Sequence, residues 1–321
     1  MTSLATRHLV DPELAPLLEM FPTTALSDET LAGARERSMA FPVDPAADEA
    51  VAGERRRIAG PSGAPDVDVL CYRPKAATGS LPCILHVHGG GYVLGDAGSM
   101  AAFHKPLALE LECAIVSVDY RLAPETRFPG AVEDAYAGLG WLVANAGEIG
   151  VDVAHIGVMG ESAGGGLAAA LALLARDRKE HALTFQHLIY PMLDDRTGAG
   201  ADPHPFAGEF IWPAANNRFG WRALLGVEPG SEGVSQYAAA ARADSLAGLP
   251  ATYISTGALD LFVEEDMDYA RRLIRDGVPT ELHVYPGAFH GFDFAAGVDV
   301  ADRSRRDSMA ALRRALRPPV R

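Results

Sequence analysis

The feature that most constrains this fold is an alternation of short apolar runs with helix-like stretches. Six apolar runs have the length and composition of buried strands: 83–87, 114–118, 156–159, 185–190, 251–256 and 282–285. Two short extended runs, 55–59 and 67–73, precede them. Helical patterns follow most of these runs, and this alternation is typical of parallel strands joined by right-handed crossovers. We therefore expect an α/β fold with a mostly parallel, eight-stranded sheet and helices on both faces.

One interval breaks this alternation. Between Tyr190 and Leu249 no run has the character of a strand, and the segment is rich in turn residues and aromatic side chains. A structureless loop of this length is uncommon in a compact domain. The interval is therefore expected to be an inserted subdomain or lid.

The first 50 residues are expected to be helical. Asp11, which a proline follows, is expected to start one helix, and Ser27 to cap a second helix over 27–39. Residues 44–50 are expected to form a linker to the first strand.

Composition excludes several classes of protein. The net charge of −14 argues against a nucleic-acid partner, because phosphate contacts need a basic face. The arginines at 55–57 and 303–317 are interpreted as solvated faces, the second on a terminal amphipathic helix. No signal peptide or membrane-spanning run is found. The odd cysteine count fits reduced thiols rather than disulfides or a metal site, so the cytoplasm is the expected location. The three cysteines are Cys71, Cys83 and Cys113.

The most specific motif is Gly160-Glu161-Ser162-Ala163-Gly164-Gly165. It lies where a strand-like run meets an Ala/Leu-rich helical run, which is the context of a nucleophile elbow. The turn must be so sharp that side chains at the glycine positions would clash. We therefore expect Ser162 to lie exposed at the start of a helix.

Chemically useful residues follow four of the predicted strands. They are the His88-Gly89-Gly90-Gly91 loop, Ser162, Asp260 and His290. Because ligands bind at the carboxyl ends of parallel strands, we expect these groups to meet at one edge of the sheet. The order serine, acid, histidine is that of α/β-hydrolases.

This constellation predicts nucleophilic catalysis. His290 would remove the Ser162 proton at neutral pH, and Asp260 would orient the imidazole and stabilise its charged form. The backbone N–H groups of Gly89, Gly90 and Ala163 would bind the oxyanion of the tetrahedral intermediate.

Each of these residues has an alternative interpretation. Ser162 would also suit a helix cap, and Asp260 could cap the next helix, with Glu264 or Asp266 as the acid. His283 competes with His290, but it lies within a strand rather than just after one. His86 and His88 have a metal-like spacing, but no further ligands accompany them, so no metal site is expected.

Together these motifs resemble the hormone-sensitive-lipase-like (bacterial family IV) branch of α/β-hydrolase carboxylesterases. The matching segments are 88–91, 160–165 and Asp119-Tyr120-Arg121-Leu122-Ala123-Pro124-Glu125. The local sequence at 193–196, 237–239 and 289–291 is also similar to that of actinobacterial heroin-esterase-type acyl esterases.

The resemblance implies the catalytic triad Ser162, Asp260 and His290 and the oxyanion hole of Gly89, Gly90 and Ala163. It also implies a catalytic domain over 51–193 and 236–321, under a helical cap built from 1–50 and 194–235. Expected pocket residues are Tyr92, Glu161, Phe206, Trp212 and Leu261, and expected supporting residues are His88, Arg121, Glu125 and Glu264. The Ala123–Pro124 and Phe128–Pro129 bonds are candidates for cis geometry. Glu161 and Leu261 depart from the family, which more often has Asp and Pro at these positions.

The predicted function is a serine carboxylesterase that hydrolyses short-to-medium acyl esters through an acyl-enzyme intermediate. The alternatives are a receptor-like α/β-hydrolase that only binds its ligand, and an amidase, lactonase or thioesterase with the same triad. No cofactor, nucleic-acid partner or membrane partner is expected. Whether the chain is a monomer or a homodimer is left open.

Overall fold

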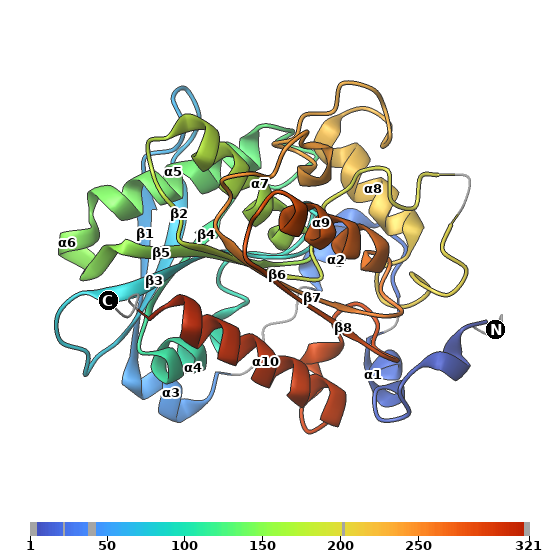
Figure 1. The fold of residues 1–321 in the computed structure, drawn as a ribbon, viewed down its shortest axis with the longest axis horizontal. Coiled ribbons are helices and arrows are strands. Elements are labelled where there is room, and N and C mark those ends of the chain that lie inside the picture. The colour runs from blue at the N-terminus through green and yellow to red at the C-terminus, as the bar shows by residue number, and fades with distance from the viewer. Residues whose placement is uncertain (1–4, 22, 38–42, 201–202, 318–321) are drawn as a thin grey trace.

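The computed structural model describes residues 5–21, 23–37, 43–200 and 203–317. One eight-stranded sheet runs through the molecule in the order β1-β2-β4-β3-β5-β6-β7-β8 (Figure 1). β1 and β2 pair antiparallel with each other, β2 pairs antiparallel with β4, and all other neighbours are parallel. The strands are β1 (Val51–Ile58), β2 (Val67–Pro74), β3 (Leu81–Val87), β4 (Ala114–Asp119), β5 (Val151–Glu161), β6 (Phe185–Ile189), β7 (Ala251–Gly257) and β8 (Thr280–Tyr285). The predicted mostly parallel eight-stranded sheet is confirmed.

Helices cover both faces of the sheet (Figure 1). One apolar core lies between the sheet and α5, α7 and α9, and a second lies between the opposite face and α1, α4 and α10. β3 illustrates the period of two, because Leu85 enters the first core and Ile84 the second. The helices are α1 (Ala15–Met20), α2 (Leu31–Glu36), α3 (Pro45–Ala50), α4 (Ala101–Leu111), α5 (Gly130–Ala144), α6 (Ala146–Ile149), α7 (Ala163–Arg178), α8 (Ala214–Leu225), α9 (Val263–Arg275) and α10 (Asp299–Ala315).

The N-terminal elements differ from those expected. The first helix begins at Ala15 rather than Asp11, whose carboxylate instead accepts a turn bond from the Glu13 N–H at 2.9 Å. α2 is shorter than the predicted helix 27–39, of which residues 38 and 39 lie outside the described part. The expected linker over 44–50 is wrong. It forms α3, which Asp44 caps by accepting from the Ala46 N–H at 2.8 Å.

The N-terminal segment and the 194–235 insertion pack together. The Asn216 side chain of α8 accepts from the Leu26 N–H and donates to the Thr24 carbonyl, both at 2.9 Å. Glu209 likewise accepts from the Ala5 and Thr6 N–H groups at 2.7 and 2.8 Å. The described insertion contains one α-helix and no strand. The division into a cap and a catalytic domain stays a prediction.

Candidate active site

Ser162 lies in a sharp turn between β5 and α7. Its backbone has φ of +56° and ψ of −124°, a conformation that is rare for a residue with a side chain. A Cβ at Gly160 would overlap the Gly164 carbonyl oxygen, and one at Gly164 would overlap the Val87 carbonyl oxygen. The glycines of the motif are therefore required by close backbone approach, as the sequence predicts.

Ser162, His290 and Asp260 form one hydrogen-bonded chain. His290 Nε2 lies 2.9 Å from Ser162 Oγ, and His290 Nδ1 lies 2.8 Å from Asp260 Oδ2. All three side chains are buried, and Asp260 is fully enclosed. The expectation of an exposed Ser162 is therefore wrong: the residue is 6% exposed and lines a pocket rather than the outer surface. The other Asp260 oxygen accepts from the Phe262 N–H at 3.0 Å, which fixes the carboxylate. This arrangement can move a proton from the serine hydroxyl to the imidazole.

Backbone bonds hold the loops that carry the acid and the histidine. The Ala258 N–H donates to the Tyr285 carbonyl at 2.8 Å, and the Leu259 N–H donates to the Ala288 carbonyl at 2.9 Å. A Cβ at Gly257 would overlap the Ala288 carbonyl oxygen, so the two loops touch through bare backbone. Their relative position is therefore set mainly by main-chain contacts.

The competing residues lie elsewhere. His283 is on β8 and bonds to Glu281 at 2.8 Å. Glu264 is exposed in the first turn of α9, whereas Asp266 is fully buried, and burial raises its pKa well above the usual range. The structure thus brings Asp260, and neither of the alternatives, to His290.

The three predicted oxyanion donors belong to residues close to the serine: Gly89 and Gly90 line the same pocket as Ser162, and Ala163 follows it in the chain. Within the described chain, the N–H groups of Gly89 and Gly90 donate no hydrogen bond, and that of Ala163 belongs to the unpaired first turn of α7. Gly90 has φ of +116°, and a Cβ on it would overlap the Leu94 carbonyl oxygen. A Cβ on Gly89 would come within 2.9 Å of the Glu161 carbonyl oxygen. The free donors therefore lie on a tightly packed backbone.

His88 and Tyr120 support this glycine loop. The His88 ring stacks on Tyr120 with centroids 4.2 Å apart, and Nδ1 bonds to the Gly89 carbonyl at 2.8 Å. The Tyr120 hydroxyl donates to the His88 carbonyl at 2.9 Å. Burial lowers the pKa of His88, which keeps the imidazole neutral beside the loop.

The segment after β4 is held by two ion pairs. Arg121 binds Asp134 through two nitrogens at 2.8 and 2.7 Å, and Asp134 is fully buried. Glu125 binds Arg35 of α2 at 2.7 and 2.9 Å, and this pairing lowers the pKa of Glu125 to about 2. The Ala123–Pro124 bond in this segment is cis, as is Phe128–Pro129.

A pocket of about 420 Å³ opens above Ser162. Its walls include the glycine loop, His88, His290, Tyr190 and side chains of the N-terminal segment. Glu161 and Trp212 line it, as the sequence predicts. Trp212 closes tightly on the glycine loop, because a Cβ at Gly91 would overlap its ring.

Three expected pocket residues are not among the described residues that line this pocket. Tyr92 is buried beneath it, where its hydroxyl donates to the Met192 carbonyl at 3.1 Å. Phe206 is 51% exposed, and Leu261 packs against the backbone at Gly208. The pocket prediction is corrected for Tyr92, Phe206 and Leu261.

Several supporting residues escape sequence reasoning. Glu265, and not the predicted Glu264, faces inward and accepts from the Leu193 and Asp194 N–H groups at 2.6 and 3.3 Å. Burial raises the pKa of Glu265 well above its usual range. Arg35 is a second such residue, and nothing in its local sequence marks it. His86 is a third.

His86 contacts Glu161, the residue before the serine. His86 Nε2 lies 3.0 Å from Glu161 Oε2, and His86 Nδ1 lies 3.0 Å from Ser117 Oγ. The His86-x-His88 spacing therefore serves two different networks. Among the described residues, no group of three or more His, Cys, Asp or Glu side chains is arranged to hold a metal ion.

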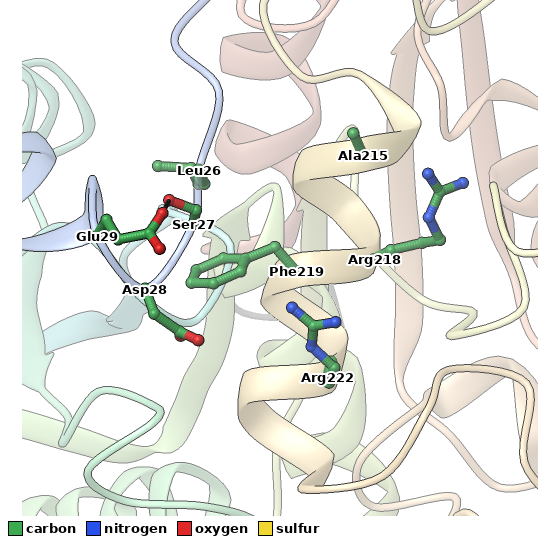
Figure 2. A pocket seen from close by; sticks show the side chains of 8 residues that line it. All are labelled: Leu26, Ser27, Asp28, Glu29, Ala215, Arg218, Phe219 and Arg222. Carbon is green, nitrogen blue, oxygen red and sulfur yellow. Dashed lines mark hydrogen bonds between the residues drawn. The ribbon is translucent and has the colours of Figure 1, made fainter.

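A second, smaller pocket of about 320 Å³ lies between the N-terminal segment and α8 (Figure 2). Its walls carry Asp28 and Glu29 on one side and Arg218 and Arg222 on the other. No member of the Ser162–His290–Asp260 chain lines it.

Within the described residues, none of the helices is both long enough and apolar enough to cross a bilayer.

Comparison with known proteins gives consistent matches. A family model described as the alpha/beta hydrolase fold matches residues 84–294. The carboxylesterase NlhH of Mycobacterium tuberculosis is 34% identical over 314 residues, which is 96% of each chain. A bacterial heroin esterase superposes with a TM-score of 0.88 at 39% identity, covering 98% of this chain and all of the other. Esterase LipW of Mycobacterium marinum has a TM-score of 0.82 at 34% identity, covering 98% of both chains.

Proposed function

The chain belongs to the α/β-hydrolase family, in its hormone-sensitive-lipase-like branch, and is a carboxylic-ester hydrolase; from this premise we propose that Ser162 is its nucleophile. The observation that carries the proposal is the continuous chain from Ser162 Oγ through His290 to Asp260. A catalytic serine needs a base within hydrogen-bond reach and a group that orients the base, and this chain supplies both.

The reaction runs in two halves. His290 Nε2 removes the proton from Ser162 Oγ as it attacks the ester carbonyl, and the resulting oxyanion accepts from the N–H groups of Gly89, Gly90 and Ala163. His290 then gives the proton to the leaving alcohol, and the acyl group stays on Ser162. In the second half, His290 removes a proton from water as the water attacks the acyl carbonyl, and the proton then returns to Ser162 Oγ as the carboxylic acid leaves. Asp260 stabilises the imidazolium in both halves.

Short-to-medium acyl esters are the proposed substrates. The pocket above Ser162 has about 420 Å³, which lies toward the lower end of the roughly 300–1,000 Å³ usual for small-molecule sites. Most of its lining is apolar; besides the reacting groups, the polar lining residues are Arg35, Arg37, His88, Ser99, Glu161 and Tyr190. Amides, lactones and thioesters would use the same three residues. Matched rates on an ester, an amide and a lactone of one acyl group would rank these substrates.

The first test is Ser162→Ala, which removes the nucleophile and leaves the fold intact. We expect kcat for p-nitrophenyl acetate to fall by at least about 10⁴-fold, because the three residues act as a unit. Ser80→Ala is the control and should keep full activity, because Ser80 is exposed and does not line the pocket above Ser162. Turnover that survives Ser162→Ala would exclude this mechanism.

The acyl-enzyme has a separate test. With methanol added, acetate esters of different alcohols should partition between water and methanol in one constant ratio, because all pass through the same acetyl-Ser162. A ratio that changes with the leaving group would exclude a common intermediate.

We also propose that the protein acts in the cytoplasm. Its three cysteines are unpaired, and Cys83 and Cys113 are buried, as is usual for proteins of reducing compartments. Fractionation of the native cells, with activity followed in each fraction, would test the location.

A further inference from the structure

A third and larger cavity, distinct from the pocket above Ser162 and from the pocket of Figure 2, lies on the sheet face that α4 and α10 cover. It has about 890 Å³, roughly twice the volume of the pocket above Ser162. Its floor is formed by Met159 of β5 and Ile189 of β6, and its walls by Phe103, Leu107 and Met309 of the two helices. α4 and α10 lie below the sheet in Figure 1. We call this cavity the α4/α10 groove.

The groove adjoins the catalytic pocket. Met100, Glu161 and Phe294 line both cavities, and Glu161 is bonded directly to Ser162 in the chain. Phe294 packs edge-on against Phe103 of the groove wall, with ring centroids 5.3 Å apart. Met100 and Phe294 are thus the partition between the two cavities. Phe294 is 36% exposed.

Apart from Arg306, for which the described residues supply no ion pair, the charged groups that line the groove are already paired within the protein. Arg313 of α10 pairs with Glu110 of α4, and Arg305 pairs with Asp302. Asp293 accepts from the Tyr190 hydroxyl at 2.8 Å, and burial raises the pKa of Asp293. What remains for a ligand is mostly hydrocarbon surface, which suits an alkyl chain better than an ionic ligand.

Because the two cavities adjoin and share these lining residues, we infer that the α4/α10 groove is a subsite for the distal end of a linear acyl chain of about ten carbons. The inference rests on the proposed function, because it places the ester carbonyl at Ser162. The catalytic pocket alone fits a short acyl group, and the groove beyond Met100 and Phe294 takes the further methylenes. The enzyme should therefore accept esters of saturated acids of about ten carbons as well as acetates.

The test compares p-nitrophenyl decanoate with p-nitrophenyl acetate, the decanoate below its micelle-forming concentration. The measured quantity is the decanoate-to-acetate ratio of kcat/KM. Met309→Trp fills the groove from α10, and we expect the ratio to fall at least tenfold, since a single methylene in an apolar pocket is worth about tenfold or more. Phe294→Ala removes an aromatic ring from between the two cavities and so widens the opening between them. We therefore expect the decanoate-to-acetate ratio of kcat/KM to rise.

The control fills a cavity of the same protein that does not adjoin Ser162. Ala215→Trp puts the same indole into the pocket of Figure 2 and should leave the ratio unchanged. The two groove variants shift the ratio in opposite directions, so misfolding of either one cannot imitate the expected pattern. A ratio unchanged in both Met309→Trp and Phe294→Ala would overturn the inference. The Ser162→Ala variant separates the two failures. If the ratio is unchanged and acetate turnover is lost in Ser162→Ala, only the groove assignment fails. If acetate turnover survives in Ser162→Ala, the proposed function fails as well.

Discussion

The edge of the sheet and the predicted cap are held together in different ways. At the sheet edge, the acid and histidine loops meet through backbone hydrogen bonds, and no side chain fits between Gly257 and Ala288. In the predicted cap, the N-terminal segment and the insertion meet largely through side chains such as Asn216 and Glu209. The side chain of Arg35 then joins the N-terminal segment to the chain after β4. Main-chain contacts fix atoms to within tenths of an ångström, which proton transfer requires, whereas a cap needs only to shape access. Substitutions should therefore act on turnover at the sheet edge and on substrate binding in the cap.

Among changes that leave the three reacting side chains in place, the largest expected effect is at the elbow. Gly164→Ala places a methyl group on the carbonyl oxygens of Val87 and His88, so the turn that presents Ser162 has to shift. A displacement of about 1 Å at the reacting atoms can lower the rate by about 10²-fold, and we expect at least this loss in kcat for p-nitrophenyl acetate. Gly147→Ala in α6 is the matched control, because no atom lies within 4 Å of its Cβ position. Equal rates for the two variants would show that close packing does not set the elbow.

The two regions also differ in their response to acid. Burial lowers the pKa of His187, on β6, to about 3, whereas an unfolded histidine titrates near 6.5. The unfolded chain therefore binds a proton that the folded sheet rejects, and stability that is complete above about pH 6.5 is lost as the pH falls toward 3. The Arg35–Glu125 pair, which joins the predicted cap to the predicted catalytic domain, should persist through this window, because the pKa of Glu125 is about 2.

Urea unfolding at pH 7, 6 and 5 measures this difference. His187→Gln should reduce the fall in unfolding free energy by up to about 1.4 kcal/mol for each pH unit below 6.5, the contribution of one proton. The exposed His8→Gln is the control and should keep the slope of the unmodified protein. The same slope in all three proteins would contradict a neutral, buried His187.

The contrast between the two regions also explains what the sequence can and cannot predict. Period-two and period-3.6 patterns, strand ends and glycine spacing are local signals, and they predict the sheet and the chain order of Ser162, Asp260 and His290. Two adjacent acids on a helix point about 100° apart, and nothing local indicates that Glu265 faces inward while Glu264 faces solvent. Contacts between distant side chains leave no local signal at all.

α3 is a different kind of error. Asp44 followed by Pro45 is an N-cap with proline at the first helical position, a recognisable helix start. The sequence does carry this signal, but the short, polar stretch that follows has no apolar period, and this absence favours a linker. Short helices that pack by one or two small residues, as α3 does through Ala47, are the elements that periodicity detects least well.

The smallest expected effect is in the cap, at Arg35. Its guanidinium donates to the carbonyls of Val93 and Ala123, each at 2.8 Å, and to both oxygens of Glu125. Lysine keeps the charge but cannot reach several acceptors with one planar fork, so Arg35→Lys should loosen α2 over the catalytic pocket. Because Glu125 is largely exposed, the loss in unfolding free energy should stay below about 1 kcal/mol.

The kinetic signature separates this loosening from damage to the catalytic chain. Arg35 lines the pocket, and its hydrogen bonds within the described residues go to Val93, Ala123 and Glu125 rather than to the catalytic chain, so KM for p-nitrophenyl acetate should rise a few-fold while kcat stays within about twofold. Arg57→Lys, at an exposed ion pair with Asp68 on the outer strands, is the control and should change neither constant. A fall in kcat with unchanged KM would mean that Arg35 positions the catalytic groups through the glycine loop. The predicted cap would then position the catalytic groups as the sheet edge does. The rule that the sheet edge controls turnover and the cap controls substrate binding would not hold for Arg35.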